Sequence, residues 1–123
     1  MSTRYQSFAE FWPFYVCEHS LPRTRVLHFI GTATILPLFI YAVFYNLLVA
    51  LLIPLSAYGF AWYSHFFVEK NRPATFVYPL WSLLGDFKMF GLMCCGRMEA
   101  EVQRCRQEMT GRASELEAGK REP

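Results

Sequence analysis

The middle of the chain lacks charge over a long distance. From Val26 to Val68, a stretch of 43 residues, there is no Asp, Glu, Lys or Arg. This is about twice the roughly 20 apolar residues that a helix needs to cross a bilayer. Asn46 follows Tyr45 near the middle, and Asn tolerates turn geometry. The stretch therefore predicts a two-pass transmembrane hairpin, and the alternative is a helical hairpin buried in a soluble core.

Other absences exclude several classes of protein. The 12 Lys and Arg are almost balanced by 10 Asp and Glu, so the chain lacks the basic excess that binds nucleic acid. The cysteines form no CxxC motif, and the adjacent Cys94 and Cys95 cannot easily form a normal disulfide, so free thiols are expected. Glu10 and Glu18 interrupt the first apolar residues, which argues against a cleaved signal peptide.

Positive charges flank only one end of the predicted hairpin. The turn carries no charge, whereas basic residues lie near both outer ends: Arg23, Arg25, Lys70, Arg72 and Lys88. Cytosolic loops of membrane proteins are enriched in Lys and Arg, so both termini are predicted to be cytosolic. The expected location is the bacterial inner membrane, or the endoplasmic reticulum in a eukaryote.

Shorter helices are predicted on both sides of the hairpin. Upstream, Ser7 and Glu10 form a capping box, and Pro13 is expected to kink an amphipathic helix. The residues on its apolar face are Phe8, Phe11, Trp12, Tyr15 and His19. Downstream, the segment from Pro79 to Met93 is too short and too polar to span, which predicts an interfacial or re-entrant helix. The expected fold is all-α, an integral membrane helical bundle with a two-pass transmembrane hairpin and flanking amphipathic helices.

The end of the chain differs in composition from the rest. Residues 97 to 123 hold six Lys and Arg and six Asp and Glu, half or more of each kind in the chain. Charges of both signs at helical spacing are typical of a solvated helix, here expected to fray into disorder. We therefore divide the chain into a membrane-embedded helical domain, residues 1–96, and a charged cytosolic tail, residues 97–123.

The three histidines are predicted to meet at the cytosolic end of the hairpin. His28 lies 18 residues before Asn46, and His65 lies 19 residues after it. At about 1.5 Å per helical residue, both lie about 27 to 29 Å from the turn, close to the hydrocarbon thickness. A short segment joins His19 to His28, so the chain can fold His19 over the same place. Glu69, four residues after His65, is expected on the same helix face.

His19, His28, His65 and Glu69 together form a predicted metal site. Neutral imidazole and carboxylate suit iron, zinc or manganese, and spacing does not choose among these metals. In the alternative interpretation, each histidine is an interfacial anchor or a hydrogen-bonded ring, and Glu69 pairs with a nearby arginine. Asp86 is interpreted as a charge on a helix surface, with a supporting position beside the metal as the alternative.

Two runs of sequence resemble a known family. They are FWPFYVCEHSLPRTRVLHFIGT, from Phe11 to Thr32, and YGFAWYSHFFVEKNRPATF, from Tyr58 to Phe76. The skeleton that carries the resemblance is His19, His28, Gly31, His65, Glu69, Arg72 and Pro73. It resembles the fungal 2-hydroxy fatty acid dioxygenase family, long known in bacteria as a domain of unknown function, over roughly residues 8 to 95. Ala61 and Ser64 stand where the fungal form typically has Gln and Gly, and the short, Phe-rich chain is similar to a bacterial branch.

The resemblance implies an Fe(II)-dependent dioxygenase that shortens a 2-hydroxy fatty acid by one carbon during fatty acid α-oxidation. It implies that His19, His28 and His65 bind the iron and that Glu69 is a fourth ligand or a catalytic base. The implied partners are a 2-hydroxy fatty acid or related lipid, dioxygen, and the membrane lipid around the hairpin.

Three arginines stand near the predicted site. Arg23, Arg25 or Arg72 would bind the substrate carboxylate through charge-assisted hydrogen bonds, or would only orient the hairpin as flanking charges. Two other functions stay open as alternatives. One is a non-catalytic membrane protein whose hairpin binds lipid or a partner helix, and the other is a zinc hydrolase with Glu18 or Glu69 as its base.

Overall fold

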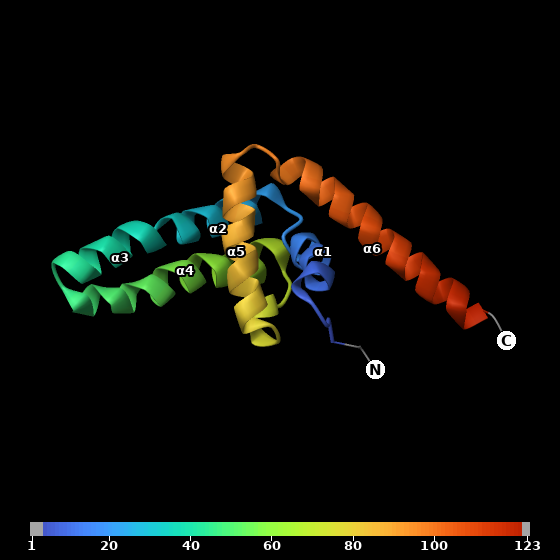
Figure 1. Ribbon diagram of the computed structural model, residues 1–123, viewed down its shortest axis with the longest axis horizontal. Coiled ribbons are helices and arrows are strands. Elements are labelled where there is room, and N and C mark those ends of the chain that lie inside the picture. The colour runs from blue at the N-terminus through green and yellow to red at the C-terminus, as the bar shows by residue number, and fades with distance from the viewer. Residues whose placement is uncertain (1–3, 122–123) are drawn as a thin grey trace.

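A computed structural model describes residues 4–121 of the protein (Figure 1). Its elements are α1 (Phe8–Glu18), α2 (Pro22–Ala33), α3 (Ile35–Phe44), η1 (Leu47–Leu51), α4 (Leu52–Tyr63), η2 (Ser64–Glu69), η3 (Ala74–Phe76), α5 (Pro79–Cys94) and α6 (Met98–Arg121). The elements η1 and η3 are 3₁₀ helices, and η2 is a π-helix. No β-strand occurs within residues 4–121, which confirms the predicted all-α class.

A long hairpin forms one half of the molecule. One arm consists of α2 and α3 and the other of η1, α4 and η2, and Figure 1 shows the two arms side by side. The arms, Pro22–Phe44 and Leu47–Glu69, have 23 residues each and are apolar enough to cross a membrane by length and composition. Only 17% and 11% of their apolar windows are buried, unlike the core helices of a soluble protein. Insertion into a bilayer stays a prediction.

The breaks in the hairpin follow from a proline and an asparagine. Pro37 has no N–H to donate to the carbonyl of Ala33, and α2 ends at Ala33 before α3 begins. At the turn, Asn46 caps η1, because its side-chain oxygen accepts a hydrogen bond from the Leu48 N–H at 3.1 Å. The turn therefore lies where the sequence predicts it.

Helix α1 begins at the predicted cap. The Ser7 hydroxyl accepts a hydrogen bond from the Glu10 N–H at 3.2 Å. The Glu10 carboxylate accepts from the Gln6 N–H at 2.8 Å, one residue before the position that a capping box would use. The helix then continues through Pro13 to Glu18 as one element. It carries His19 at its C-terminal cap.

Helix α5 crosses the base of the hairpin, and both described ends of the chain lie opposite the hairpin turn (Figure 1). Its bounds, Pro79–Cys94, agree with the short helix predicted from Pro79 to Met93. A two-pass hairpin requires both ends of the chain to lie on one side. Which side of a membrane they occupy stays a prediction.

An aromatic core joins α1, α5 and α6 next to the hairpin. Its buried residues are Phe11, Trp12, Tyr15, Val16, Ala74, Met89, Met98, Val102 and Cys105. Helix α6 contributes three of them from one face, so it is not solvated on all sides as a free tail would be. The Trp12 indole N–H donates to the Glu101 carboxylate at 2.7 Å. The Arg104 guanidinium beside Glu101 lowers the pKa of that carboxyl to about 2, which keeps this acceptor ionised.

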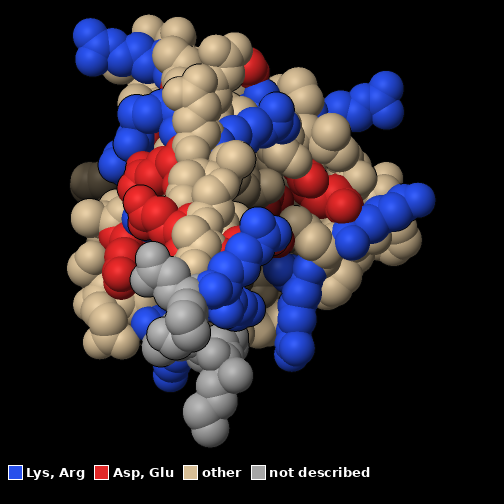
Figure 2. Space-filling model, turned by 90° about the vertical axis from the view of Figure 1, so that its right-hand side faces the viewer, with Lys and Arg blue, Asp and Glu red and all other residues tan. Residues whose placement is uncertain are grey.

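The outer surface of this end of the molecule is charged. Figure 2 shows Lys and Arg side chains spread around this face with Asp and Glu between them. On α6, Arg104 pairs with Glu101 and Glu108, and Arg112 pairs with Glu108. The helix continues to Arg121, and the expected fraying at Glu122 and Pro123 lies outside the described residues. The molecule thus has one apolar end, the hairpin, and one charged end.

Candidate metal centre

The three histidines converge in the interior, each from a different element. His19 caps α1, His28 lies in α2 and His65 lies in the π-helix η2. Their ring centroids are 4.3 Å (His19–His28), 4.6 Å (His19–His65) and 5.0 Å (His28–His65) apart. One nitrogen of each ring lies within 4.8 Å of the others, and the residues are only 1%, 5% and 2% exposed. The structure therefore gathers a possible three-histidine ligand set.

Close packing of the hairpin arms brings His28 and His65 together. Gly31 lies one turn after His28, and a Cβ at this position would stand only 3.1 Å from the Ala57 carbonyl oxygen of the opposite arm. The missing side chain lets α2 and α4 approach at this level. The π-helix η2 then carries His65 at its start, and such wide turns are common at functional sites.

Hydrogen bonds fix the tautomer of two of the three rings. Nδ1 of His19 is 2.6 Å from the Tyr15 carbonyl oxygen, and Nδ1 of His65 is 2.7 Å from Oδ1 of Asn71. Nδ1 of His28 is 3.4 Å from Oδ1 of Asp86. The Tyr15 carbonyl oxygen and Oδ1 of Asn71 are acceptors, so Nδ1 of His19 and of His65 carries the hydrogen and their Nε2 atoms keep lone pairs. This tautomer presents Nε2 for metal binding.

Two of the ring nitrogens are buried without a hydrogen-bond partner in the part of the chain that the structure describes, and a bound metal ion would satisfy them. Nε2 of His19 and Nε2 of His28 are buried and have no hydrogen-bond partner among the described residues. Burial lowers the pKa of His19 well below its usual value, with the neighbouring histidines as a further cause, so its ring stays neutral as a ligand must. The cavity at the three rings holds only about 10 Å³, enough for an ion or one water.

A carboxylate stands beside the rings, but it comes from α5. The side chain of Asp86 is 17% exposed, faces His28, and accepts a hydrogen bond from the Tyr15 hydroxyl. The interpretation of Asp86 as a surface charge is therefore wrong, because α5 crosses the hairpin with this residue inward. Burial raises the pKa of Asp86, an effect that the Tyr15 hydrogen bond opposes. Burial and Asp86 raise the pKa of Tyr15, so its hydroxyl stays a donor.

A comparison with known families identifies the family of the chain. The sequence model of the family described as 2-hydroxy-palmitic acid dioxygenase Mpo1-like matches residues 5–98, which include all three histidines and Asp86. The chain belongs to this family. The resemblance seen in the sequence is thereby confirmed. No curated protein and no solved structure matches this Mpo1-like chain.

Glu69 of this Mpo1-like chain lies away from the three rings. Its carboxylate accepts hydrogen bonds from the Leu21 N–H at 2.6 Å and from the Ser20 hydroxyl at 3.3 Å. It does not belong to the group of ligand atoms formed by the histidines. Its contacts with the segment between α1 and α2 hold the carboxylate there. Glu69 instead braces the junction between α1 and α2.

The three arginines have different surroundings. Arg25 is 3% exposed and donates to the carbonyl oxygens of His19 and Ser20 at 2.9 and 2.8 Å, and it also pairs with Glu99. It therefore holds the backbone of the His19 turn. Arg23 and Arg72 are exposed, and the Arg72 guanidinium lies 5.2 Å from the centre of the Phe76 ring. The structure does not bring these three side chains together at the histidines.

Two further residues at the site are missed by the sequence reasoning. The Asn71 amide nitrogen donates to the backbone and side-chain oxygens of Glu18 at 3.0 and 2.7 Å, which turns Oδ1 toward His65. Ser82 lines the cavity of the three rings, and its buried hydroxyl has no partner among the described residues. The only signal for Asn71 is its place just after the His65 helix, in the stretch that carries the family resemblance.

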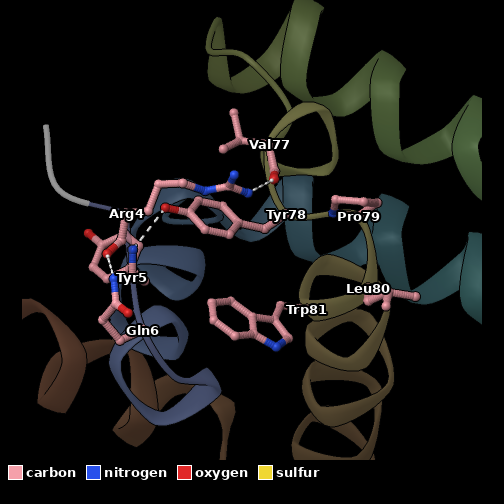
Figure 3. Close-up of a pocket in the computed structure, with 8 residues that line it drawn as sticks. All are labelled: Arg4, Tyr5, Gln6, Val77, Tyr78, Pro79, Leu80 and Trp81. Carbon is pink, nitrogen blue, oxygen red and sulfur yellow. Dashed lines mark hydrogen bonds between the residues drawn. The ribbon is translucent and has the colours of Figure 1, made fainter.

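A larger pocket lies elsewhere on the Mpo1-like fold, and Figure 3 shows the residues that line it. Its volume is about 400 Å³, and its wall includes Arg4, Tyr5, Tyr78 and Trp81. Arg4 donates to the Val77 carbonyl at 2.9 Å, and the Tyr5 N–H donates to the Tyr78 hydroxyl at 3.0 Å. None of the three histidines lines this pocket. We assign the candidate site to the histidines instead.

The site depends on a glycine in α5, which gives a test by mutation. A Cβ at Gly85 would lie 2.9 Å from the Tyr15 ring, which is buried and stacks on His19 with centroids 4.1 Å apart. Gly85→Ala is expected to destabilise the protein by about 1–3 kcal/mol through overpacking. The matched control is Gly91→Ala on the same helix, where a Cβ meets nothing within 4 Å. There, alanine should stabilise the helix by about 0.5–1 kcal/mol.

Thermal unfolding in detergent, followed by circular dichroism, measures both variants. Equal stabilisation by the two substitutions would contradict the close contact between α5 and Tyr15.

Proposed function

We propose that the protein is a membrane-embedded Fe(II)-dependent dioxygenase that shortens 2-hydroxy fatty acids by one carbon. One observation carries the proposal: three buried imidazoles converge with one nitrogen of each within 4.8 Å of the others, and acceptors hold Nδ1 of His19 and of His65 so that their Nε2 atoms keep lone pairs. The family name, which describes a 2-hydroxy-palmitic acid dioxygenase, supplies the substrate class.

His19, His28 and His65 would hold the metal through Nε2. Bound iron with three protein ligands would keep positions open for dioxygen and for a chelating 2-hydroxy acid, and it would supply the redox chemistry. The balanced reaction converts a 2-hydroxy acid and dioxygen into the acid one carbon shorter, carbon dioxide and water. The bond between C1 and C2 breaks, and these two carbons give up the four electrons that reduce dioxygen.

The surrounding residues keep the rings in place and limit water. Asn71 accepts from the Nδ1 hydrogen of His65, which fixes the tautomer and orientation of that ring, and the Asp86 carboxylate lies 3.4 Å from Nδ1 of His28. Tyr15 donates to Asp86 and covers His19 on one side. The Ser82 hydroxyl is free to donate to or accept from a substrate oxygen at the cavity. The small cavity excludes bulk water from the rings.

The proposed location in a membrane suits an amphiphilic substrate. The hairpin would span the bilayer with both termini in the cytosol, since its outer faces are apolar and its flanks are basic. The histidines lie at the C-terminal cap of α1, in α2 and in η2, so they stand at the end of the hairpin away from its turn. The acid head of a lipid would meet the rings there while its alkyl chain stays in an apolar environment.

Metal analysis and oxygen uptake on detergent-purified protein test the proposal. We expect about one iron per chain, oxygen consumption with 2-hydroxypalmitic acid, and a product one carbon shorter by mass spectrometry. Palmitic acid is the matched control, because it lacks the hydroxyl and cannot chelate. Stoichiometric zinc without oxygen uptake would favour the hydrolase. Absence of both metal and uptake would favour a non-catalytic lipid-binding protein.

A further inference from the structure

A second cavity opens next to the three-histidine site. It has a volume of about 200 Å³, lies between the two hairpin arms and α5, and shares His28 and Asp86 with the histidine cavity. From these polar residues it extends along α2 to Ile35, seven positions beyond His28, or about 10 Å of helix. The residues at its far end are apolar. The cavity is thus polar where it meets the candidate metal centre and apolar beyond it.

The break between α2 and α3 and a proline of the opposite arm contribute to this space. Ile35 begins α3 just after the break at Thr34, and Pro54 in the opposite arm also lines the cavity. Leu83 of α5 closes one side. A straight pair of helices in contact along their length would leave less room, since prolines remove hydrogen bonds and bend helices.

A larger space in the hairpin lacks the contact with the site. It has a volume of about 710 Å³, lies between α3 and α4 nearer the turn, and is lined by Tyr41, Leu52 and Leu55 among others. It shares no residue with the histidine cavity, and a head group there could not reach the rings. Continuity with the metal centre therefore favours the smaller cavity.

We propose that the cavity between His28 and Ile53 holds the alkyl chain of the substrate, with the 2-hydroxy acid head at His28 and Asp86. The occupant is a long-chain 2-hydroxy acid, and this identity rests on the proposed function. The first part of the chain lies between α2, α4 and α5, and the rest leaves along the hairpin toward lipid. The preference for the length of the alkyl chain is then determined by Ile35, Ile53 and Leu83.

Filling the far end of the cavity tests this assignment. The tryptophan ring of Ile53→Trp would occupy the far end of the cavity, which only the longer chain reaches. We therefore expect the kcat/KM for 2-hydroxypalmitic acid, divided by that for 2-hydroxyoctanoic acid, to fall by about tenfold or more. Metal content should not change. Leu55→Trp is the matched control on the same helix, because Leu55 is 69% exposed and does not line this cavity. Leu83→Trp, from α5, replaces Ile53→Trp if that variant does not fold.

A binding measurement separates this inference from the proposed function. A 2-hydroxy acid with a photoreactive diazirine in the middle of its chain should label Ile35, Ile53 or Leu83, located by mass spectrometry of the peptides. Such labelling without oxygen uptake would support the cavity and count against the dioxygenase. Oxygen uptake with labelling only on outer residues such as Leu55, and with Ile53→Trp behaving as Leu55→Trp, would overturn the cavity assignment and leave the dioxygenase standing.

Discussion

The His65→Ala variant is expected to purify as a folded helical protein that has lost its stoichiometric metal and its oxygen uptake. Among residues 4–121, the group of metal-ligating atoms that the structure gathers consists of the three imidazoles, so removing one leaves two. Loss of a supporting hydrogen bond alone costs about 10–100-fold in metal affinity, and loss of a ligand should cost more. Metal content per chain after equilibrium dialysis against buffered Fe(II) measures the effect. His19→Ala and His28→Ala should behave in the same way.

The matched control for this prediction is Ser64→Ala. Ser64 is the buried neighbour of His65 in η2, and its hydroxyl donates only to the Ala61 carbonyl within the same arm. This variant should keep its metal. That result would show that a substitution elsewhere in η2 does not remove the metal. A His65→Ala protein with full metal content would refute the ligand assignment.

The second large effect is expected from Asn71, which never contacts the metal in this proposal. Asn71→Leu keeps the size of the side chain but removes the acceptor for Nδ1 of His65 and the two hydrogen bonds to Glu18. The His65 ring would lose its fixed tautomer and orientation, so metal affinity should fall by about 10–100-fold. Competition with a metal chelator of known affinity measures this change directly.

Asn46→Leu is the control for the asparagine variant. Asn46 caps η1 at the hairpin turn, at the other end of the arms from the rings. Its substitution should therefore leave the metal affinity unchanged. Activity at saturating iron gives a second readout. If Asn71 only orients the ligand, excess iron should restore much of the oxygen uptake. Unchanged metal affinity in Asn71→Leu would show that the hydrogen bond does not hold His65.

The hairpin and the meeting of its histidines follow from the sequence because both depend on simple lengths. A charge-free segment of fixed rise per residue places His28 and His65 at equal distance from Asn46, and the structure brings their rings together. The same counting fails for Glu69, because its carboxylate is held by the Leu21 N–H and the Ser20 hydroxyl. Spacing within one helix does not predict such contacts with a distant segment.

Tertiary packing accounts for the other differences. The direction of Asp86 depends on how α5 crosses the hairpin, and no pattern within α5 specifies that crossing. For α6 a signal existed: Met98, Val102 and Cys105 recur at spacings of four and three, the pattern of a helix face. The dense charges around them suggested a solvated tail instead. For α6, the spacing of the apolar residues therefore predicts packing against the core better than the charged composition does.

Arg25 links the far end of the chain to the metal centre. Its buried guanidinium holds the carbonyl oxygen of His19 on one side and the carboxylate of Glu99, in the first turn of α6, on the other. A protein shortened to its apolar part would keep the cation and lose its counter-charge, next to a proposed ligand. Through Glu99, helix α6 therefore helps to hold the backbone that carries an imidazole of the proposed site.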